Sequence, residues 1–245
     1  MNPVICCPPV CGMACAARAL SRSGISVSVR PGAECTHLLL PVPSYSGGIP
    51  KFPPELLDQI PSEAVILGGM LPEIPGHPAV DLLKDPLYLA KNAAVTAQCA
   101  LTLAAARLPV VWEKLPVLIL GWGRIGRFLA LKLSVLGAAV SVAARRLESR
   151  AEIEALGLEA LDIRHLYDEI SRFRLIYNTV PAPVLSAGEA ERCRIDCLKI
   201  ELASSPGIAG DGIVDGRGLP GRLAPESAGQ LIAETVCRLI KEEKL

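Results

Sequence analysis

Three glycines in the second half of the chain have the spacing of a phosphate-binding turn. Gly121, Gly123 and Gly126 follow the apolar run at 117–120 and precede a stretch with the apolar periodicity of a helix. In such a turn the first glycine permits a tight bend, the second leaves room for a diphosphate, and the third lets helix and strand pack closely. The spacing therefore predicts a dinucleotide site on the N–H groups at the start of a helix. The residues assigned to it are Gly121, Trp122, Gly123, Arg124, Ile125 and Gly126.

Two arginines stand where the ribose of the dinucleotide is expected. Sites that prefer NAD have an Asp or Glu about 20 residues further on, because a carboxylate accepts hydrogen bonds from the ribose hydroxyls. This chain has Arg145 and Arg146 there, and a guanidinium group binds a 2′-phosphate through two hydrogen bonds. We therefore expect NADP in preference to NAD, with Ser149 and Arg150 as secondary contacts. The alternative is that both arginines only solvate the start of a helix.

These residues require parallel strands with helices between them. Short apolar runs alternate with helical segments in both halves of the chain, which is typical of parallel sheets. We expect an α/β fold with two Rossmann-like lobes, of which the C-terminal one binds the dinucleotide. The expected strands cover 4–7, 25–29, 37–43, 64–69, 116–121, 138–144, 173–180 and 197–203. The expected helices cover 12–24, 54–60, 92–108, 124–136, 148–156, 164–171 and 225–243.

The domain boundaries follow from the long Ala- and Leu-rich helix expected at 92–108, which bridges the two lobes. Residues 1–91 are expected to form a short N-terminal lobe for the substrate or a partner. Residues 92–225 are expected to form the NADP-binding domain. Residues 226–245 are expected to form a C-terminal helix, with the N-terminal lobe as its candidate packing partner.

Charge and hydropathy argue against two classes of partner. The 25 basic and 25 acidic residues cancel, so the charge balance does not point to nucleic acid. Hydrophobic residues make up 51% of the chain, yet no apolar run approaches the roughly 18 residues of a membrane span. The first ten residues lack a basic segment followed by an apolar one, so we expect no secretory signal and a cytoplasmic location.

Nine cysteines raise the alternative of a metal or redox site. Four of them crowd residues 6–15, but their spacing does not match the common zinc pairs. A free cysteine behaves as a small apolar residue, so we expect packing roles and no metal site. The role of the N-terminal cluster stays open. The cysteines interpreted in this way are Cys6, Cys7, Cys11, Cys15, Cys193 and Cys197.

Five motifs occur together in an order that resembles one known family. They are LILGWGRIGRFLA (118–130), AARR (143–146), YNTVPAPVL (177–185), ELASSPGIAGD (201–211) and GLPGRLAPESAGQLI (218–232). Over roughly residues 88–240 the chain resembles the A subunit of dipicolinate synthase, a two-domain relative of the 2-hydroxyacid and shikimate dehydrogenases. The N-terminal part matches more loosely, through THLLLPVPSYSGG (36–48). Glu201 stands where this family usually has Asp, and Glu226 where a basic residue is common.

The resemblance implies an activity and a set of partners. It implies oxidation of dihydrodipicolinate to dipicolinate during spore formation, with hydride transfer to NADP. It also implies a second, flavoprotein-like subunit, and a homo-oligomer stays open. No catalytic residue is assigned. The residues that the resemblance places beside the nicotinamide are Asn178, Thr179, Val180 and Pro181, and a second wall of the cofactor site is expected to contain Ser204 and Gly207.

A small dicarboxylate needs cations and polar groups at the carboxyl ends of the strands. Arg222 is the first choice for a carboxylate contact, and Ser44 follows an expected strand of the N-terminal lobe. Asn92 and Thr96 lie one turn apart on the expected bridging helix, so they share a face. The alternative is a helix cap for Asn92 and a core-facing hydroxyl for Thr96.

Two other functions are compatible with the sequence. The first is an NADP-dependent oxidoreductase of hydroxyacid or shikimate type that acts on another small carboxylate. A hydroxyacid enzyme needs an imidazole near the nicotinamide, and none of His37, His77 and His165 is expected there. The second is a non-catalytic cofactor-binding subunit, because the N-terminal lobe is shorter than is usual for the family.

Overall fold

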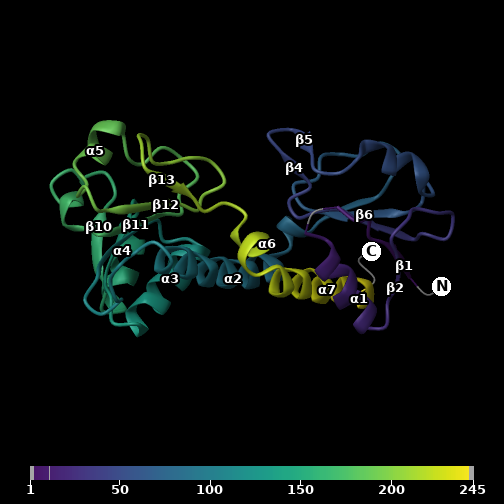
Figure 1. Ribbon diagram of the computed structural model, residues 1–245, viewed down its shortest axis with the longest axis horizontal. Coiled ribbons are helices and arrows are strands. Elements are labelled where there is room, and N and C mark those ends of the chain that lie inside the picture. The colour runs from purple at the N-terminus through teal and green to yellow at the C-terminus, as the bar shows by residue number, and fades with distance from the viewer. Residues whose placement is uncertain (1–2, 11, 243–245) are drawn as a thin grey trace. The chain divides into compact units, whose positions relative to one another are not determined.

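The chain folds into two compact units. The computed structural model describes residues 3–10 and 12–242. The first unit contains the residues up to Val95 and those from Pro220 onward, and the second contains Thr96–Leu219 (Figure 1). The sequence predicts domain boundaries after residues 91 and 225, whereas the two units divide after residues 95 and 219. The long helix α2 (Pro86–Ala105) passes from the first unit into the second.

A parallel sheet with the strand order β2-β1-β3-β6-β7 forms the centre of the first unit. Its strands are β1 (Val4–Cys6), β2 (Ser26–Ser28), β3 (His37–Leu39), β6 (Val65–Gly68) and β7 (Ala79–Asp81). The remaining elements are α1 (Ala14–Arg22), the hairpin of β4 (Tyr45–Ser46) and β5 (Ile49–Pro50), the 3-10 helices η1 (Pro54–Gln59) and η2 (Leu82–Lys84), α6 (Leu219–Leu223) and α7 (Pro225–Lys241).

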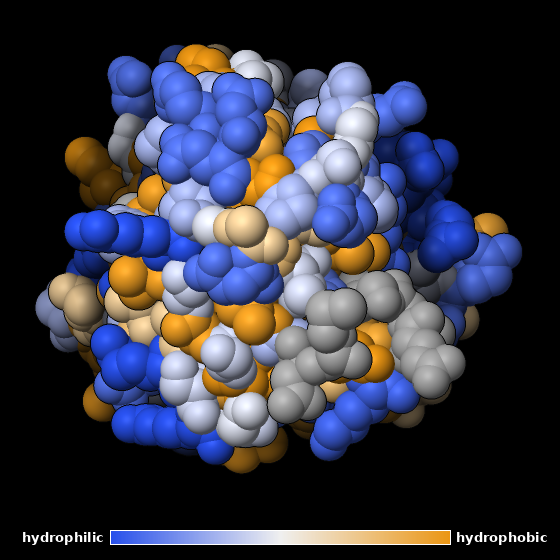
Figure 2. All heavy atoms as spheres, turned by 90° about the vertical axis from the view of Figure 1, so that its right-hand side faces the viewer, coloured by the Kyte–Doolittle hydropathy of each residue, from blue (hydrophilic) through white to orange (hydrophobic). Residues whose placement is uncertain are grey.

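The C-terminal helix α7 packs on α1 within the first unit. A Cβ at Gly229 would lie 2.6 Å from the backbone N of Ala16 and 2.6 Å from the carbonyl carbon of Cys15, so only glycine permits this approach. Residues of α7 such as Leu231 and Val236 share one hydrophobic core with the sheet. In Figure 2, hydrophobic residues lie scattered among hydrophilic ones on the surface of this end. The apolar side of α7 is therefore turned inward.

The second unit is built on a parallel sheet with the order β10-β9-β8-β11-β12-β13. Chain order reverses between β8 and β11, and ligands of open parallel sheets bind at such a reversal, beyond the carboxyl ends of the strands. This sheet and that of the first unit confirm the predicted α/β class. The strands are β8 (Pro116–Leu120), β9 (Ala139–Ala144), β10 (Glu159–Asp162), β11 (Leu175–Asn178), β12 (Leu198–Glu201) and β13 (Ile213–Asp215). The helices are α3 (Arg124–Val135), α4 (Leu147–Ala155), α5 (Ala187–Glu191) and the 3-10 helix η3 (Ile170–Arg172).

The prediction of a helix at 164–171 is wrong. The Asp162 carboxylate accepts hydrogen bonds from the backbone N and from Nε of Arg164, at 3.0 and 2.9 Å. Such local bonds compete with helix formation, and the segment forms turns before the short 3-10 helix Ile170–Arg172. His165 therefore lies in a turn rather than on a helix.

Several negative findings hold for the part of the chain that the structure describes. Within it, no helix combines the length and apolar character needed to cross a membrane, and no three potential ligands gather as a metal site would require. Its cysteines are all free thiols. Burial raises the pKa of Cys6 to about 12, helped by Cys35, and that of Cys7 to about 11. Cys11 lies outside the described residues.

Candidate dinucleotide site

The turn between β8 and α3 begins at Gly121. Its φ of +103° is a left-handed conformation that favours glycine, and its N–H donates to the carbonyl of Ala143 at 2.9 Å. A Cβ at this position would lie 2.6 Å from Oγ1 of Thr179 and 2.8 Å from Cγ2 of Val180. Gly121 thus allows the bend and also lets the end of β11 come close.

The other two glycines of the motif have different surroundings. A Cβ at Gly126 would collide with the carbonyl oxygen of Gly121, so this glycine is required for close packing of α3 on the turn. A Cβ at Gly123 would meet no atom within 4 Å. Gly123 is the N-cap of α3 and supplies no side-chain acceptor to the helix. The first N–H groups of α3 are therefore open to an anion at an uncrowded surface, which fits a diphosphate.

The end of β9 presents two arginines beside this turn. The side chains of Arg145 and Arg146 are exposed, and no described residue forms an ion pair with either. Arg150 is engaged instead: it pairs with Asp162 at 2.9 Å and donates to the carbonyls of Ala144 and Arg145, both at 3.2 Å. Arg150 thus fixes the loop, while the guanidinium groups of Arg145 and Arg146 can still take a phosphate.

The end of β11 is anchored to β8. Thr179 donates from its backbone N and from Oγ1 to the carbonyl of Leu120, at 2.9 and 2.8 Å. Val180 and Thr179 are half-buried, and Pro181 is exposed. Asn178 is among the predicted cofactor contacts, but its side chain is fully buried and lies beside Glu201. Residues Thr179–Pro181 thus form the accessible part of this loop.

Two residues at the end of β12 complete this edge of the sheet. Ser204 is exposed, as a ligand contact must be. Glu201 is only 4% exposed although its side chain ends in a carboxyl group, and it was not among the predicted site residues. The available sequence signal was an acidic residue between the apolar residues Ile200 and Leu202. Its position opposite Asn178 in the paired strand is seen only in the structure.

The predicted substrate residues are divided between the units. Ser44 lies in the first unit and is fully buried; its hydroxyl donates to the carbonyl of Pro41 at 2.6 Å and accepts from the N–H of Gly69 at 3.1 Å. Asn92 is half-buried on α2, and Arg222 is exposed on α6. Thr96 begins the second unit and is 7% exposed. Of the four side chains, that of Arg222 is the most accessible to a dissolved carboxylate.

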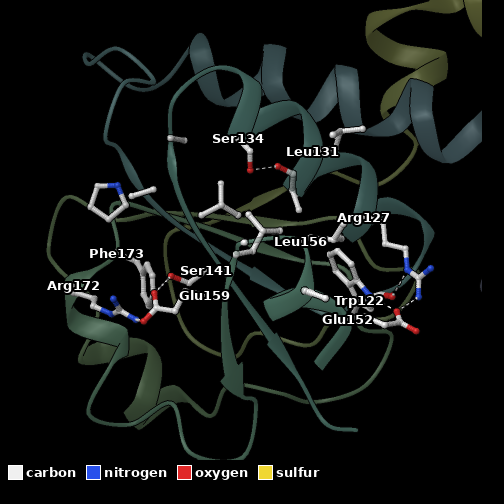
Figure 3. Close-up of a pocket in the computed structure, with 18 residues that line it drawn as sticks. Trp122, Arg127, Leu131, Ser134, Ser141, Glu152, Leu156, Glu159, Arg172 and Phe173 are labelled. Carbon is white, nitrogen blue, oxygen red and sulfur yellow. Dashed lines mark hydrogen bonds and ion pairs between the residues drawn. The ribbon is translucent and has the colours of Figure 1, made fainter. Parts of the chain in front are cut away.

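A pocket of about 980 Å³ lies beside α3 and α4 in the second unit (Figure 3). At one side, Trp122 Nε1 and Arg127 Nη2 donate to Glu152 Oε2, at 2.8 and 2.7 Å. At the other side, Arg172 Nη2 donates to Glu159 Oε1 at 2.6 Å. These polar groups satisfy one another, and the rest of the wall is mostly apolar. The pocket therefore does not replace the glycine turn as the candidate dinucleotide site.

Comparison with known proteins identifies a relative by sequence. No family model matches the chain. Over 202 residues, which are 76% of this chain and 68% of the relative, it is 28% identical to the A subunit of dipicolinate synthase from Bacillus subtilis (strain 168). The chain is a homologue of the A subunit of dipicolinate synthase. The predicted resemblance is thereby confirmed.

Solved structures share the fold of this chain. The A subunit of dipicolinate synthase from Bacillus halodurans matches with a TM-score of 0.81 at 23% identity, covering 97% of this chain and 96% of that one. A transhydrogenase from Sinorhizobium meliloti matches with a TM-score of 0.72 at 16% identity, over 91% and 79%. An L-alanine dehydrogenase matches with a TM-score of 0.67 at 14% identity, over 97% and 90%. At these identities the matches establish the fold.

Proposed function

We propose that the chain is an NADP-dependent dehydrogenase of the dipicolinate synthase type, which oxidises dihydrodipicolinate to dipicolinate. The observation that carries the proposal is the open, uncapped start of α3 at Gly123 with the exposed pair Arg145 and Arg146 at the end of the neighbouring strand. This arrangement suits a dinucleotide with a third phosphate. The homology to dipicolinate synthase supports the substrate.

Different residues of the second unit would bind different parts of the dinucleotide. The first N–H groups of α3 would hold the diphosphate, and Arg145 and Arg146 the 2′-phosphate. Thr179–Pro181 and Ser204 would flank the nicotinamide, which when bound supplies the hydride acceptor. Oxidation of the dihydropyridine ring transfers one hydride and releases one ring proton. Because the product is aromatic, the reaction is downhill, and alignment and exclusion of water would supply most of the catalysis.

The relative is named as one subunit of its enzyme, which supports a second protein in the complete system. We propose a flavoprotein-like partner subunit, a role in spore formation and a cytoplasmic location. Arg222 is our candidate for one carboxylate of the substrate, since it is exposed on α6. Co-purification of the two subunits from cells that express both would support the assembly, and separate elution at micromolar concentration would count against it.

The activity is tested with purified chain, NADP and dihydrodipicolinate, with and without the partner subunit. We expect NADPH absorbance and dipicolinate to appear together in equal amounts. Gly188→Ala is a matched control, because a Cβ there meets no atom within 4 Å on the exposed helix α5. Absence of both products under all conditions, with a folded protein, would rule out the proposed reaction.

A non-catalytic, cofactor-binding subunit is the second candidate. It is favoured by Ser44, whose hydroxyl is fully buried and hydrogen-bonded within the first unit rather than open to a substrate. Calorimetry with NADP and with dipicolinate separates the two candidates. Binding of the nucleotide without binding of the dicarboxylate would support the second candidate, whereas binding of both would support the enzyme.

A further inference from the structure

Glu201 occupies a buried position where four N–H groups converge on one carboxylate. Oε1 accepts from Asn178 Nδ2 at 2.8 Å and from the backbone N of Ala203 at 3.0 Å. Oε2 accepts from Asn178 Nδ2 at 3.0 Å and from the backbone N of Gly207 and Ile208, at 2.8 and 3.3 Å. Every one of these groups is a donor, so the position requires an acceptor on both oxygens.

The partners of Glu201 belong to the two loops that end β11 and β12. Asn178 continues the network into the first loop, because its amide donates to the carbonyl of Val180 at 3.0 Å and its Oδ1 accepts from the N–H of Val180 at 3.0 Å. The second loop meets the first where the carbonyl of Gly207 accepts from the N–H groups of Val184 and Leu185, at 2.8 and 3.1 Å. The carboxylate therefore ties both loops at one point.

The packing around this point leaves little freedom. A Cβ at Gly207 would collide with Nδ2 of Asn178 and would lie 2.6 Å from the carbonyl oxygen of Ala182. Asn178 is fully buried and Glu201 is 4% exposed, so water does not readily replace a lost hydrogen bond. An unpaired buried donor is costly. A change at Glu201 must therefore move the loops, and Val180 in the first loop lies directly against Gly121.

We propose that Glu201 is a positioning residue of the cofactor site, which acts through Asn178 to hold the loops after β11 and β12 where the nicotinamide binds. This inference rests on the proposed dinucleotide function. Glu201 does not touch the ligand in this role. It sets the place of Thr179–Pro181 and of Ser204, and it leaves the adenosine side of the site, at Arg145 and Arg146, unaffected.

The test compares two ligands that differ in the nicotinamide half. NADPH contains it, and 2′,5′-ADP contains only the adenosine with its 2′-phosphate and 5′-phosphate. Glu201→Gln is nearly isosteric, but its NH₂ group faces N–H donors. We expect the Kd of NADPH to rise about 10- to 100-fold and that of 2′,5′-ADP to change by less than about twofold. Glu201→Asp keeps both acceptor oxygens and is expected to recover part of the affinity, and it serves as the test variant if Glu201→Gln does not fold.

A matched control and a ligand-free measurement accompany the binding data. Glu159→Gln removes another hydrogen-bonded carboxylate of the same unit, at the start of β10, and is expected to bind both ligands as the wild type does. Hydrogen exchange of the Val180, Ala203 and Gly207 amides is expected to accelerate in Glu201→Gln alone.

The outcomes separate this inference from the function on which it rests. Wild-type protein that binds neither ligand would overturn both. The positioning role alone would be overturned if the wild type binds both ligands and a folded Glu201→Gln protein shows any one of three results. These are an unchanged affinity for NADPH, unchanged hydrogen exchange, or an equal loss of affinity for both ligands.

Discussion

Replacing Gly123 with alanine would test the dinucleotide site without disturbing the fold. The new Cβ would meet no protein atom within 4 Å. The backbone at Gly123, with φ −83° and ψ −170°, is extended and open to any residue. The methyl group would occupy the surface on which the diphosphate is expected to lie against the start of α3. We therefore expect weaker binding in a protein of nearly unchanged stability.

Two opposing effects set the expected stability. At a compatible backbone conformation, Gly→Ala stabilises by about 0.4–1 kcal/mol through the unfolded state. Alanine is a poorer N-cap than glycine by roughly 0.5–1 kcal/mol. The net change is within about 1 kcal/mol, which corresponds to a Tm shift of at most about 4 °C in a chain of this size. The loss of one hydrogen bond to a charged phosphate is worth about 1.5–3 kcal/mol, or about 10- to 150-fold in Kd.

The measurement is a titration with NADPH, followed by fluorescence or calorimetry, next to a thermal melt of the same sample. Gly188→Ala is the control, because it adds the same methyl group at an equally open position of α5. If Gly123→Ala folds and binds NADPH with wild-type affinity, the diphosphate does not lie at this turn and the proposed site is wrong.

Two substitutions and one pH titration test other parts of the proposed site and its packing. Arg145→Ala is expected to weaken NADPH about tenfold or more and NADH much less, as measured by parallel titrations; equal losses would contradict a 2′-phosphate contact. The neighbouring Cys197 thiol lowers the pKa of Cys193, and the thiolate is the nucleophile, so alkylation of Cys193 by iodoacetamide, mapped by mass spectrometry, should reach half its plateau at a lower pH than that of free cysteine; a midpoint at or above that of free cysteine would refute this environment. Gly126→Ala is expected to cost about 1–3 kcal/mol and to lower the Tm by about 2–10 °C, because its Cβ collides with the backbone of Gly121; an unchanged melt would refute the close packing.

Local sequence was sufficient for the central strands and for the edge strand β2, predicted at 25–29, but insufficient for the other three edge strands of the two parallel sheets. The run 117–120 is apolar at every position, and this pattern predicts a central parallel strand. In the structure the same residues are fully buried in β8. The strands β7, β10 and β13 are short, mix polar with apolar residues and are partly exposed. Such segments form because a neighbouring strand offers hydrogen bonds, which no local pattern reveals.

The candidate site shows the same division. The glycine turn is predictable because the requirement at Gly121 is a property of the local backbone. The roles of Glu201 and Ser44 depend on partners 23 and 25 residues away, Asn178 and Gly69. Those partners are set by strand register and loop packing, so the buried state of both side chains emerges only from the fold.

The place of α7 in the first unit has a consequence for synthesis of the protein. The core of that unit includes Ile5 near the beginning and Leu239 near the end. The ribosome completes the second unit, Thr96–Leu219, before α7 exists. The core that the first sheet shares with α1 therefore stays without α7 until the second unit has been synthesised. A stop codon just ahead of Pro225 would therefore remove part of the core of the first unit, although it lies downstream of the whole second unit.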